Sequence, residues 1–209
     1  MIELYGVVRS RSNRAMWALE EIGADYAFYQ LDFSKGDHRS DFFLSLNPAG
    51  KMPTLRDGDF VLTESGAICN YLGERFSDSG LVPQGGTKER ALYDQWMFFV
   101  ISELEQPLWT KGKHKFALPQ EQRVPAIFET TIYEWKRAFN LLCSGFQGPY
   151  FLGDNFTMVD IMVAHTLRWA IVFEYPVDNQ AMLDYLERME ARPAWGRMAE
   201  KEKLEISRG

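Results

Sequence analysis

The segment KMPTLRDGDFVLTES, at positions 51–65, is the part of the chain that most limits its possible folds. Its middle holds two short strand-like runs, TLR and FVL, separated by Asp57-Gly58, which is a common tight-turn sequence. The second run leads almost without a loop into a helical pattern that begins at Ser65. The segment therefore predicts an antiparallel hairpin that passes directly into a helix.

Pro53 stands at the start of the first strand of this hairpin. Proline has no N–H group to give to a sheet, so it is found at edge strands or at the first position of a strand. If the bond between Met52 and Pro53 is cis, the chain bends sharply and Met52 presents its backbone N–H and C=O groups outward. These two groups can pair with a visiting extended peptide as an added strand would.

Charged and polar groups flank this edge. Ser65, at a helix N-terminus, offers a hydroxyl and free backbone N–H groups for a carboxylate. Glu64 can take an ammonium group, and Lys51 can take a second carboxylate. A small peptide with one ammonium and two carboxylates would satisfy the set. Taken singly, Lys51 reads as a surface lysine, Glu64-Ser65 as a helix cap and Pro53 as an edge-strand residue.

The first third of the chain alternates between strand and helix patterns, in the order β-α-β-α-β-β-α. The elements expected before the hairpin are strands at Glu3–Val7 and Tyr26–Leu31 and helices at Ser12–Gly23 and Asp41–Leu46; the helix Ser65–Arg75 follows it. Because parallel strands need a helical crossover, the first three elements form a β-α-β unit. Residues 77–87, SDSGLVPQGGT, have linker composition, so residues 1–76 are expected to form an α+β domain.

Residues 88–209 show helical patterns only, and we expect them to form an all-α helical bundle. The expected helices are Lys88–Lys111, Gln120–Cys143, Thr157–Phe173, Ala181–Glu190 and Pro193–Lys203. The predicted fold class is thus an α+β domain followed by an all-α domain.

Composition excludes several classes of partner. A net charge of −6 argues against nucleic acid and against an anionic membrane surface. The longest clean apolar run, Met97–Ile101, is too short to span a bilayer, and the N-terminal sequence lacks a signal-peptide pattern. The cysteines and histidines show no metal-ligand spacing. Cys69 and Cys143 lie in helical patterns, so we expect free thiols and the reducing cytosol.

Two motifs carry a resemblance to a known family. The pattern NPxGKxPxL at 47–55, with DG at 57–58 and LTESxAIxxYL at 62–72, resembles the glutathione-binding half of the glutathione transferase family. The pattern FLGDxFTxxD at 151–160 resembles the motif of that family's helical domain. In this second motif, Thr157 and Asp160 form a variant of the capping box that starts a helix, and they are not a binding pair.

The resemblance implies a thioredoxin-like N-terminal domain with a cis Pro53, a helical domain that forms the pocket for the electrophile, and a homodimer. It further implies glutathione as co-substrate, no other cofactor, and a small hydrophobic electrophile as the second substrate. The residue roles it implies are Glu64 and Ser65 on the γ-glutamyl end of glutathione, the Met52 backbone on its cysteinyl unit, and Lys51 on its glycyl carboxylate. His38 matches a histidine that some members use on that same carboxylate.

The thiol of glutathione needs a partner that favours the thiolate, because a free thiol has a pKa of ~8.5. A hydroxyl that donates to the sulfur at the start of a helix lowers that pKa. By resemblance to theta-like serine enzymes, Ser10 is the favoured catalytic residue and Ser12 is the alternative. Taken alone, either serine reads as an N-cap of the first helix. Tyr5 matches a sheet tyrosine better than the catalytic tyrosine of other classes.

The sequence thus predicts a glutathione transferase. A glutathione-dependent reductase, dehalogenase or isomerase would use the same thiolate, and a noncatalytic binding module on this fold is a further alternative. The loop at positions 8–14 contains no cysteine, which disfavours exchange through a mixed disulfide with the protein. An arginine near the thiol, Arg9, Arg11 or Arg14, would add positive potential.

Overall fold

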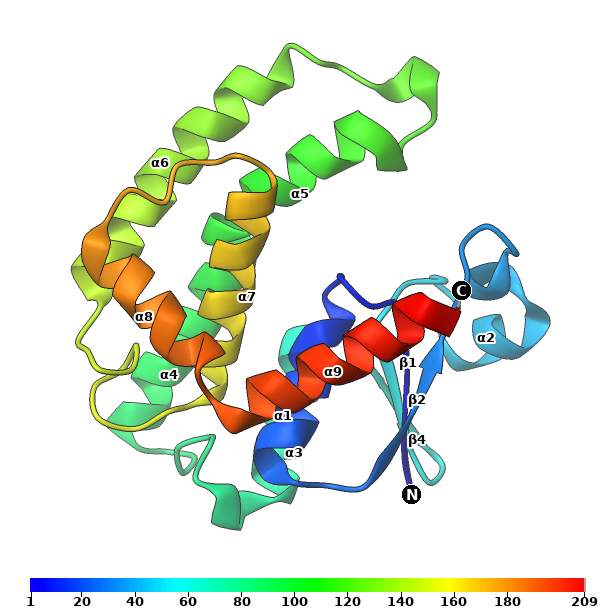
Figure 1. Cartoon of the computed structure of the whole chain (residues 1–209), viewed down its shortest axis with the longest axis horizontal. Helices are drawn as coiled ribbons and strands as arrows, with labels where there is room; N and C mark the ends of the chain where they lie inside the picture. The colour runs from blue at the N-terminus through cyan, green and yellow to red at the C-terminus, as the bar shows by residue number, and fades with distance from the viewer. Residues whose placement is uncertain (209) are drawn as a thin grey trace. The chain divides into compact units, whose positions relative to one another are not determined.

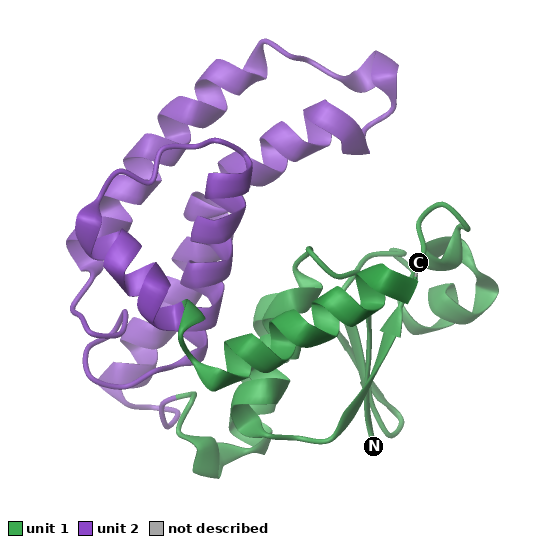
Figure 2. Ribbon diagram, in the orientation of Figure 1, with its two compact units in different colours: residues 1–82, 190–209 green, residues 83–189 purple. Residues whose placement is uncertain are grey.

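A computed structural model describes residues 1–208, and the chain divides into two compact units (Figure 1, Figure 2). Unit 1 comprises Met1–Val82 together with Glu190–Gly209, and unit 2 comprises Pro83–Met189. The predicted fold class is confirmed, since a thioredoxin-like α+β part precedes an all-helical part. The predicted domain division remains a prediction; the last helix belongs to unit 1, although it follows the linker in the sequence.

Unit 1 contains a mixed sheet with the strand order β2-β1-β3-β4. The strands are β1 (Ile2–Gly6), β2 (Tyr26–Gln30), β3 (Thr54–Asp57) and β4 (Phe60–Thr63). β1 pairs in parallel with β2 and antiparallel with β3, and β3 and β4 form the predicted hairpin. Leu4 lies opposite Leu55 in the register, and both are fully buried, so the apolar core lies against the central strands.

The helices of unit 1 cover both faces of this sheet (Figure 1). They are α1 (Ser12–Ile22), α2 (Asp41–Leu46), α3 (Ser65–Arg75) and α9 (Pro193–Arg208), with 3-10 turns η1 (Asp37–Arg39) and η2 (Ser77–Ser79). α1 and α3 pack together on one side, and α2 lies on the other side. α1 ends at Gly23, whose φ of 71° belongs to the left-handed region that glycine adopts readily.

Unit 2 is helical throughout. Its elements are α4 (Lys88–Phe99), the π-helical turn η3 (Val100–Leu104), α5 (Gln106–Gly112), the π-helical turn η4 (Lys113–Ala117), the 3-10 turn η5 (Gln120–Gln122), α6 (Ile127–Gly145), α7 (Met158–Val172) and α8 (Gln180–Glu190). The first half of α7 is buried along its whole length, which makes this helix the core of unit 2. Its predicted capping box is present, because the Asp160 carboxylate accepts a hydrogen bond of 2.7 Å from the Thr157 backbone N–H.

Three predicted helix limits differ from the structure. The helical path from Lys88 continues through its two π turns to Ala117. The helix expected to begin at Gln120 begins instead at Ile127, because Pro125 disfavours helical backbone at the residue before it. The last helix runs to Arg208 and not only to Lys203. No helix within residues 1–208 has the length and apolar character needed to cross a membrane.

Candidate functional site

The turn before β3 presents the predicted peptide-binding edge. The bond between Met52 and Pro53 is cis, as expected, and Pro53 is buried. Asn47 supports the turn, since its side-chain amide donates to the Lys51 backbone oxygen at 2.7 Å and to the Thr54 hydroxyl at 3.2 Å. The backbone N–H and C=O of Met52 make no hydrogen bond with any residue of the described chain, so both are available to a ligand.

Two opposite charges stand beside this edge. The side chains of Lys51 and Glu64 are exposed, and neither forms an ion pair within residues 1–208. Glu64 has a φ of 69°, which is rare for a residue other than glycine, and it immediately precedes α3. Backbone strain of this kind is typical of functional positions. A cation and an anion are therefore free to meet the ends of a ligand.

His38 lies close to the same turn. Gly50 has a φ of 62°, and a Cβ atom there would stand 2.8 Å from the His38 backbone oxygen, so the 3-10 turn η1 packs directly against the residue before Lys51. The His38 ring contacts Phe33, with 4.7 Å between ring centroids. Its Nδ1 is buried without a hydrogen-bond partner in the described chain.

Ser65 begins α3 and is buried. Its hydroxyl accepts a hydrogen bond of 3.2 Å from the guanidinium of Arg14, whose side chain is itself buried. The N-terminus of α3 therefore combines unpaired backbone N–H groups with a positive charge beneath them, and both favour a carboxylate. Among the arginines that the sequence left open, the structure places Arg14 at this anion site and leaves Arg9 exposed.

The two candidate serines differ in burial and in hydrogen bonding within the loop between β1 and α1. The half-buried Ser10 hydroxyl donates to the Val7 backbone oxygen at 2.5 Å, and it accepts from the Ser12 backbone N–H at 3.1 Å. Ser12 is fully buried, and its hydroxyl accepts from the Val7 N–H at 3.2 Å. Ser10 thus has the more accessible hydroxyl, while Ser12 is part of the internal support of the loop. The bond from the Ser12 N–H also gives Ser10 a capping role.

Other candidate nucleophiles lie in unsuitable places. Tyr5 is buried in the sheet, where its ring stacks on Tyr29 at 4.8 Å, and burial raises the pKa of its hydroxyl. Burial raises the pKa of the Cys69 thiol to about 12, and burial also raises the pKa of Cys143. Both cysteines are free. Within residues 1–208 no three His, Cys, Asp or Glu side chains are grouped so that they could hold a metal ion.

The aromatic side chains of the second unit divide between core and surface. Trp96 is buried against Phe99 and Phe151, at centroid distances of 5.0 and 4.8 Å. Phe98, two residues further along the same helix, is exposed. Tyr175 is buried and its hydroxyl is 2.5 Å from that of Thr131. Burial therefore explains Trp96 and Tyr175 without a ligand.

Residues 1–74 match the model of the glutathione S-transferase N-terminal domain, and residues 125–197 match that of the C-terminal domain. The disulfide-bond oxidoreductase YfcG of Escherichia coli (strain K12) is 30% identical over 217 residues, which covers 98% of this chain and 97% of that protein. The chain belongs to the glutathione S-transferase family. A probable glutathione S-transferase of Oryza sativa subsp. japonica is 42% identical over 97 residues, but this match covers only 46% of the chain and 45% of the rice protein.

Solved structures of this family have the same fold. A glutathione transferase from Methylococcus capsulatus str. Bath superposes with a TM-score of 0.84 at 28% identity, covering 98% of this chain and 100% of that chain. The theta-class glutathione S-transferase from Xanthomonas axonopodis pv. citri was solved with glutathione bound. It superposes with a TM-score of 0.75 at 29% identity, covering 94% and 95% of the two chains.

The sequence predicted the hairpin residues of this family member. It did not indicate two side chains near the loop between β1 and α1. Asn13 accepts a hydrogen bond of 3.1 Å from the Arg9 backbone N–H through its side-chain oxygen. Glu202, on α9, contacts both Asn13 and Arg9. Asn13 lies in the first turn of α1. Its buried position could therefore be found from the sequence by asking which face of this helix is apolar. Glu202 has no such local signal.

Proposed function

We propose that this family member is a glutathione transferase that binds glutathione along the turn before β3 and activates its thiol with Ser10. The observation that carries the proposal is the arrangement at this turn, where the unpaired backbone of Met52 stands between the unpaired charges of Lys51 and Glu64. Glutathione has the matching groups: a peptide backbone, one ammonium and two carboxylates.

Each end of glutathione has a proposed partner. Glu64 takes the ammonium of the γ-glutamyl unit, and the N-terminus of α3 at Ser65 takes its carboxylate, with Arg14 adding positive charge below. The backbone of Met52 pairs with the cysteinyl unit as one strand pairs with another. Lys51 takes the glycyl carboxylate, and His38, whose turn packs against Gly50, assists it in this proposal.

The proposed chemistry begins with loss of the thiol proton. The Ser10 hydroxyl carries one hydrogen, which is donated to the Val7 oxygen in the ligand-free protein. On binding, this hydrogen would turn to the sulfur, and a thiolate that accepts a hydrogen bond has a lowered pKa. The thiolate then forms a bond to an electrophilic carbon while the leaving group departs with the electron pair of the broken bond. The proton goes to solvent.

A glutathione-dependent disulfide reductase is the second candidate. It is favoured by the likeness, over nearly the whole chain, to YfcG, which is named as a disulfide-bond oxidoreductase. The same thiolate would attack a disulfide sulfur instead of a carbon. Because the loop around Ser10 has no cysteine, the mixed disulfide would form on glutathione and not on the protein. An isomerase, a dehalogenase or a noncatalytic module would share the same binding edge.

The test combines binding with turnover. Calorimetric titration of the protein with glutathione measures affinity, and the ultraviolet absorbance of the thiolate against pH measures activation. Parallel assays with an aryl halide and with a glutathione mixed disulfide then separate transfer from reduction. Binding with a thiolate near neutral pH and turnover of the aryl halide supports the transferase. Turnover of the disulfide alone favours the reductase, and absence of binding rejects both.

Lys51→Ala is expected to raise the Kd of glutathione about tenfold, because one charge-assisted hydrogen bond at an exposed site contributes about 1.4 kcal/mol. Calorimetry on the variant measures the change. The matched control is Lys88→Ala, which removes another exposed lysine far along the chain and should leave the Kd unchanged. Equal affinities of wild type and Lys51→Ala would remove Lys51 from the proposed site.

We also propose that the enzyme is a cytosolic homodimer that acts on a small hydrophobic electrophile. A groove of about 420 Å³ on unit 2 lies between η3 and α6, and it is lined by Phe99, Glu103, Gln106, Glu134, Arg137, Ala138 and Leu141. It carries both signs of charge, so that in a two-fold interface Arg137 of one copy can meet an acid of the other. The cytosol also keeps thiols such as Cys69 and Cys143 reduced.

Leu141→Glu is expected to convert the proposed dimer to monomer, since Leu141 is an exposed apolar side chain in the groove. The substitution places a carboxylate without a partner in the buried interface. Two-fold symmetry introduces it twice, once from each copy. Sedimentation velocity of wild type and variant measures the mass. Leu204→Glu, an equally exposed leucine on α9, serves as the control and should sediment like wild type. A wild type that sediments as a monomer at all concentrations contradicts the dimer.

A further inference from the structure

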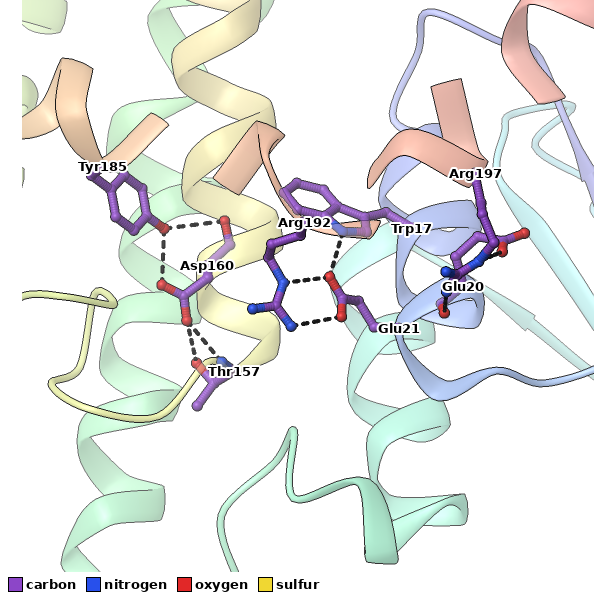
Figure 3. Close-up of polar contacts among 8 residues, drawn as sticks. All are labelled: Trp17, Glu20, Glu21, Thr157, Asp160, Tyr185, Arg192 and Arg197. Carbon is purple, nitrogen blue, oxygen red and sulfur yellow. Dashed lines mark hydrogen bonds and ion pairs between the residues drawn. The ribbon is translucent and has the colours of Figure 1, made fainter. Parts of the chain in front are cut away.

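The C-terminal helix α9 is fixed along α1 by three sets of contacts, several of which Figure 3 shows. Arg192 makes two hydrogen bonds to Glu21, of 2.6 and 2.7 Å. Arg197 and Lys201 both bind Glu20, at 2.9 and 2.6 Å. The rings of Trp17 and Trp195 meet edge to face, with 4.9 Å between their centroids.

Glu20 stays ionised in this contact. Burial acts to raise the pKa of Glu20, but the hydrogen bonds from Lys201, Arg197 and Tyr26 outweigh burial, and the pKa is lowered. The ion pairs of Glu20 are therefore complete at neutral pH. Together with the contact between Arg192 and Glu21 they hold residues 192–201 in place, and this fixes the position of the next residue, Glu202.

Glu202 reaches the loop that carries Ser10. One of its carboxylate oxygens accepts a hydrogen bond from the Asn13 side-chain amide, and the other lies 3.6 Å from Nε of Arg9. Asn13 in turn accepts from the Arg9 backbone N–H at 3.1 Å and donates its own backbone N–H to the Ser10 backbone carbonyl oxygen at 3.0 Å. Arg9, Asn13 and Glu202 thus form a closed ring of contacts beside Ser10.

The contacts of this ring hold the backbone of Arg9 in a conformation that is intrinsically unfavourable. Arg9 has a φ of 59°, in the left-handed region that residues with a side chain rarely adopt. Such a conformation persists only where its surroundings hold it. Within the described residues, the contacts that hold Arg9 by hydrogen bond or ion pair are those with Asn13 and Glu202. Arg9 directly precedes Ser10, so its conformation sets the direction of the serine.

We propose that Glu202 is a positioning residue, which holds the Arg9 backbone through Asn13 so that the Ser10 hydroxyl meets the sulfur of glutathione. The inference rests on the role proposed above for Ser10, and it extends that role to the last helix of the chain. It gives α9 a part in thiol activation without any contact between α9 and glutathione.

If Glu202 is removed, a positioning role and a charge effect predict changes of opposite sign in the pKa of the glutathione thiol. Removing a negative charge near a thiolate lowers the pKa of the thiol. Releasing the loop removes the hydrogen bond from Ser10 and raises that pKa. Glu202→Ala removes both the charge and the acceptor. Glu202→Gln removes the charge but keeps an amide oxygen that can accept from Asn13.

The experiment follows the ultraviolet absorbance of bound glutathione against pH, with steady-state kinetics. Glu202→Ala is expected to raise the apparent pKa of the thiol by about half a unit and to lower kcat about threefold, since ten to the power of one half is about three. The KM for glutathione should not change, because Lys51, Glu64 and Ser65 are untouched. Glu202→Gln should leave the pKa at or below the wild-type value. Glu205→Ala, which breaks only the pair with Arg208 on the same helix, should match wild type.

The outcomes separate this inference from the proposed function. If Ser10→Ala does not change the thiol pKa, the proposed role of Ser10 fails. If Ser10→Ala raises the pKa but Glu202→Ala lowers it or leaves it unchanged, the positioning role alone is overturned. If Glu202→Ala destabilises the fold, a double-mutant cycle in kcat between Asn13→Ala and Glu202→Met, which keeps the length of the side chain but removes the acceptor, decides the matter. Additive effects in that cycle overturn the inference, and a shared loss supports it.

Discussion

Ser10→Ala is expected to lower kcat/KM for conjugation at neutral pH by about 100-fold while leaving the Kd of glutathione nearly unchanged. Loss of the hydrogen bond from Ser10 would raise the thiol pKa by about two units, which reduces the thiolate fraction about 100-fold. A more basic thiolate is about tenfold more nucleophilic and recovers part of this loss. Loss of sulfur orientation adds about tenfold again.

The pH dependence of kcat/KM measures this change directly. Wild type should reach its plateau at a lower pH than Ser10→Ala, and the two enzymes should approach each other above the thiol pKa of the variant. Ser10→Thr keeps a hydroxyl and is the matched control. Ser12→Ala removes the acceptor of the Val7 N–H, so it should lower stability more than it moves the thiol pKa. A large pKa rise in Ser12→Ala with none in Ser10→Ala would transfer the role to Ser12.

The hairpin could be predicted because its signals are local. Pro53, the Asp57-Gly58 turn and the helix start at Ser65 lie within fifteen positions, and each acts on its own backbone. The structure has the hairpin at these residues and the helix start at Ser65. The predicted roles of Lys51, Glu64 and His38 toward glutathione remain predictions, which the calorimetry described above tests.

The sequence favoured Ser10 over Ser12 by resemblance alone, because both serines precede or begin the same helix. Their difference is one of burial, and burial depends on how β1 and α1 pack. The partners of Arg14 and Glu202 are harder still to predict, because they lie far away in the sequence. Ser65 is 51 positions from Arg14 in the chain, and Glu202 is 189 positions from Asn13. The spacing of apolar residues within one helix does not indicate such contacts.

The last helix shows the same limit on a larger scale. Its apolar spacing predicted a helix from Pro193, and the structure confirms one. No local pattern places this helix against α1, since its amphipathic face fits any apolar partner. The acids Glu20 and Glu21 and the cations Arg192 and Arg197 are all common surface residues until their pairing is known. The polar end of α9 carries the contact with the loop between β1 and α1.

Asp160→Asn is expected to destabilise the folded protein by about 3–5 kcal/mol, which lowers Tm by roughly 10 °C. Asp160 is fully buried at the start of α7. One carboxylate oxygen accepts from the Phe151 N–H at 2.7 Å and from the Tyr185 hydroxyl at 2.9 Å, and the other accepts from the Thr157 N–H at 2.7 Å. The side chain thus joins three segments of unit 2, and Figure 3 shows its contacts with Thr157 and Tyr185.

The amide of asparagine has the same shape as this carboxylate but only one acceptor oxygen. Its NH₂ group would face donors on one side, so buried N–H groups of Phe151 or Thr157 would lose their partner. Burial raises the pKa of Asp160 to about 6, so urea unfolding at pH 8 compares the ionised carboxylate with the amide. Asp154→Asn, at an exposed position in the same motif, is the control and should change the free energy of unfolding by less than about 0.5 kcal/mol. A loss below about 1 kcal/mol in Asp160→Asn would mean that the network relaxes around the amide, and α7 would then owe its position to apolar packing alone.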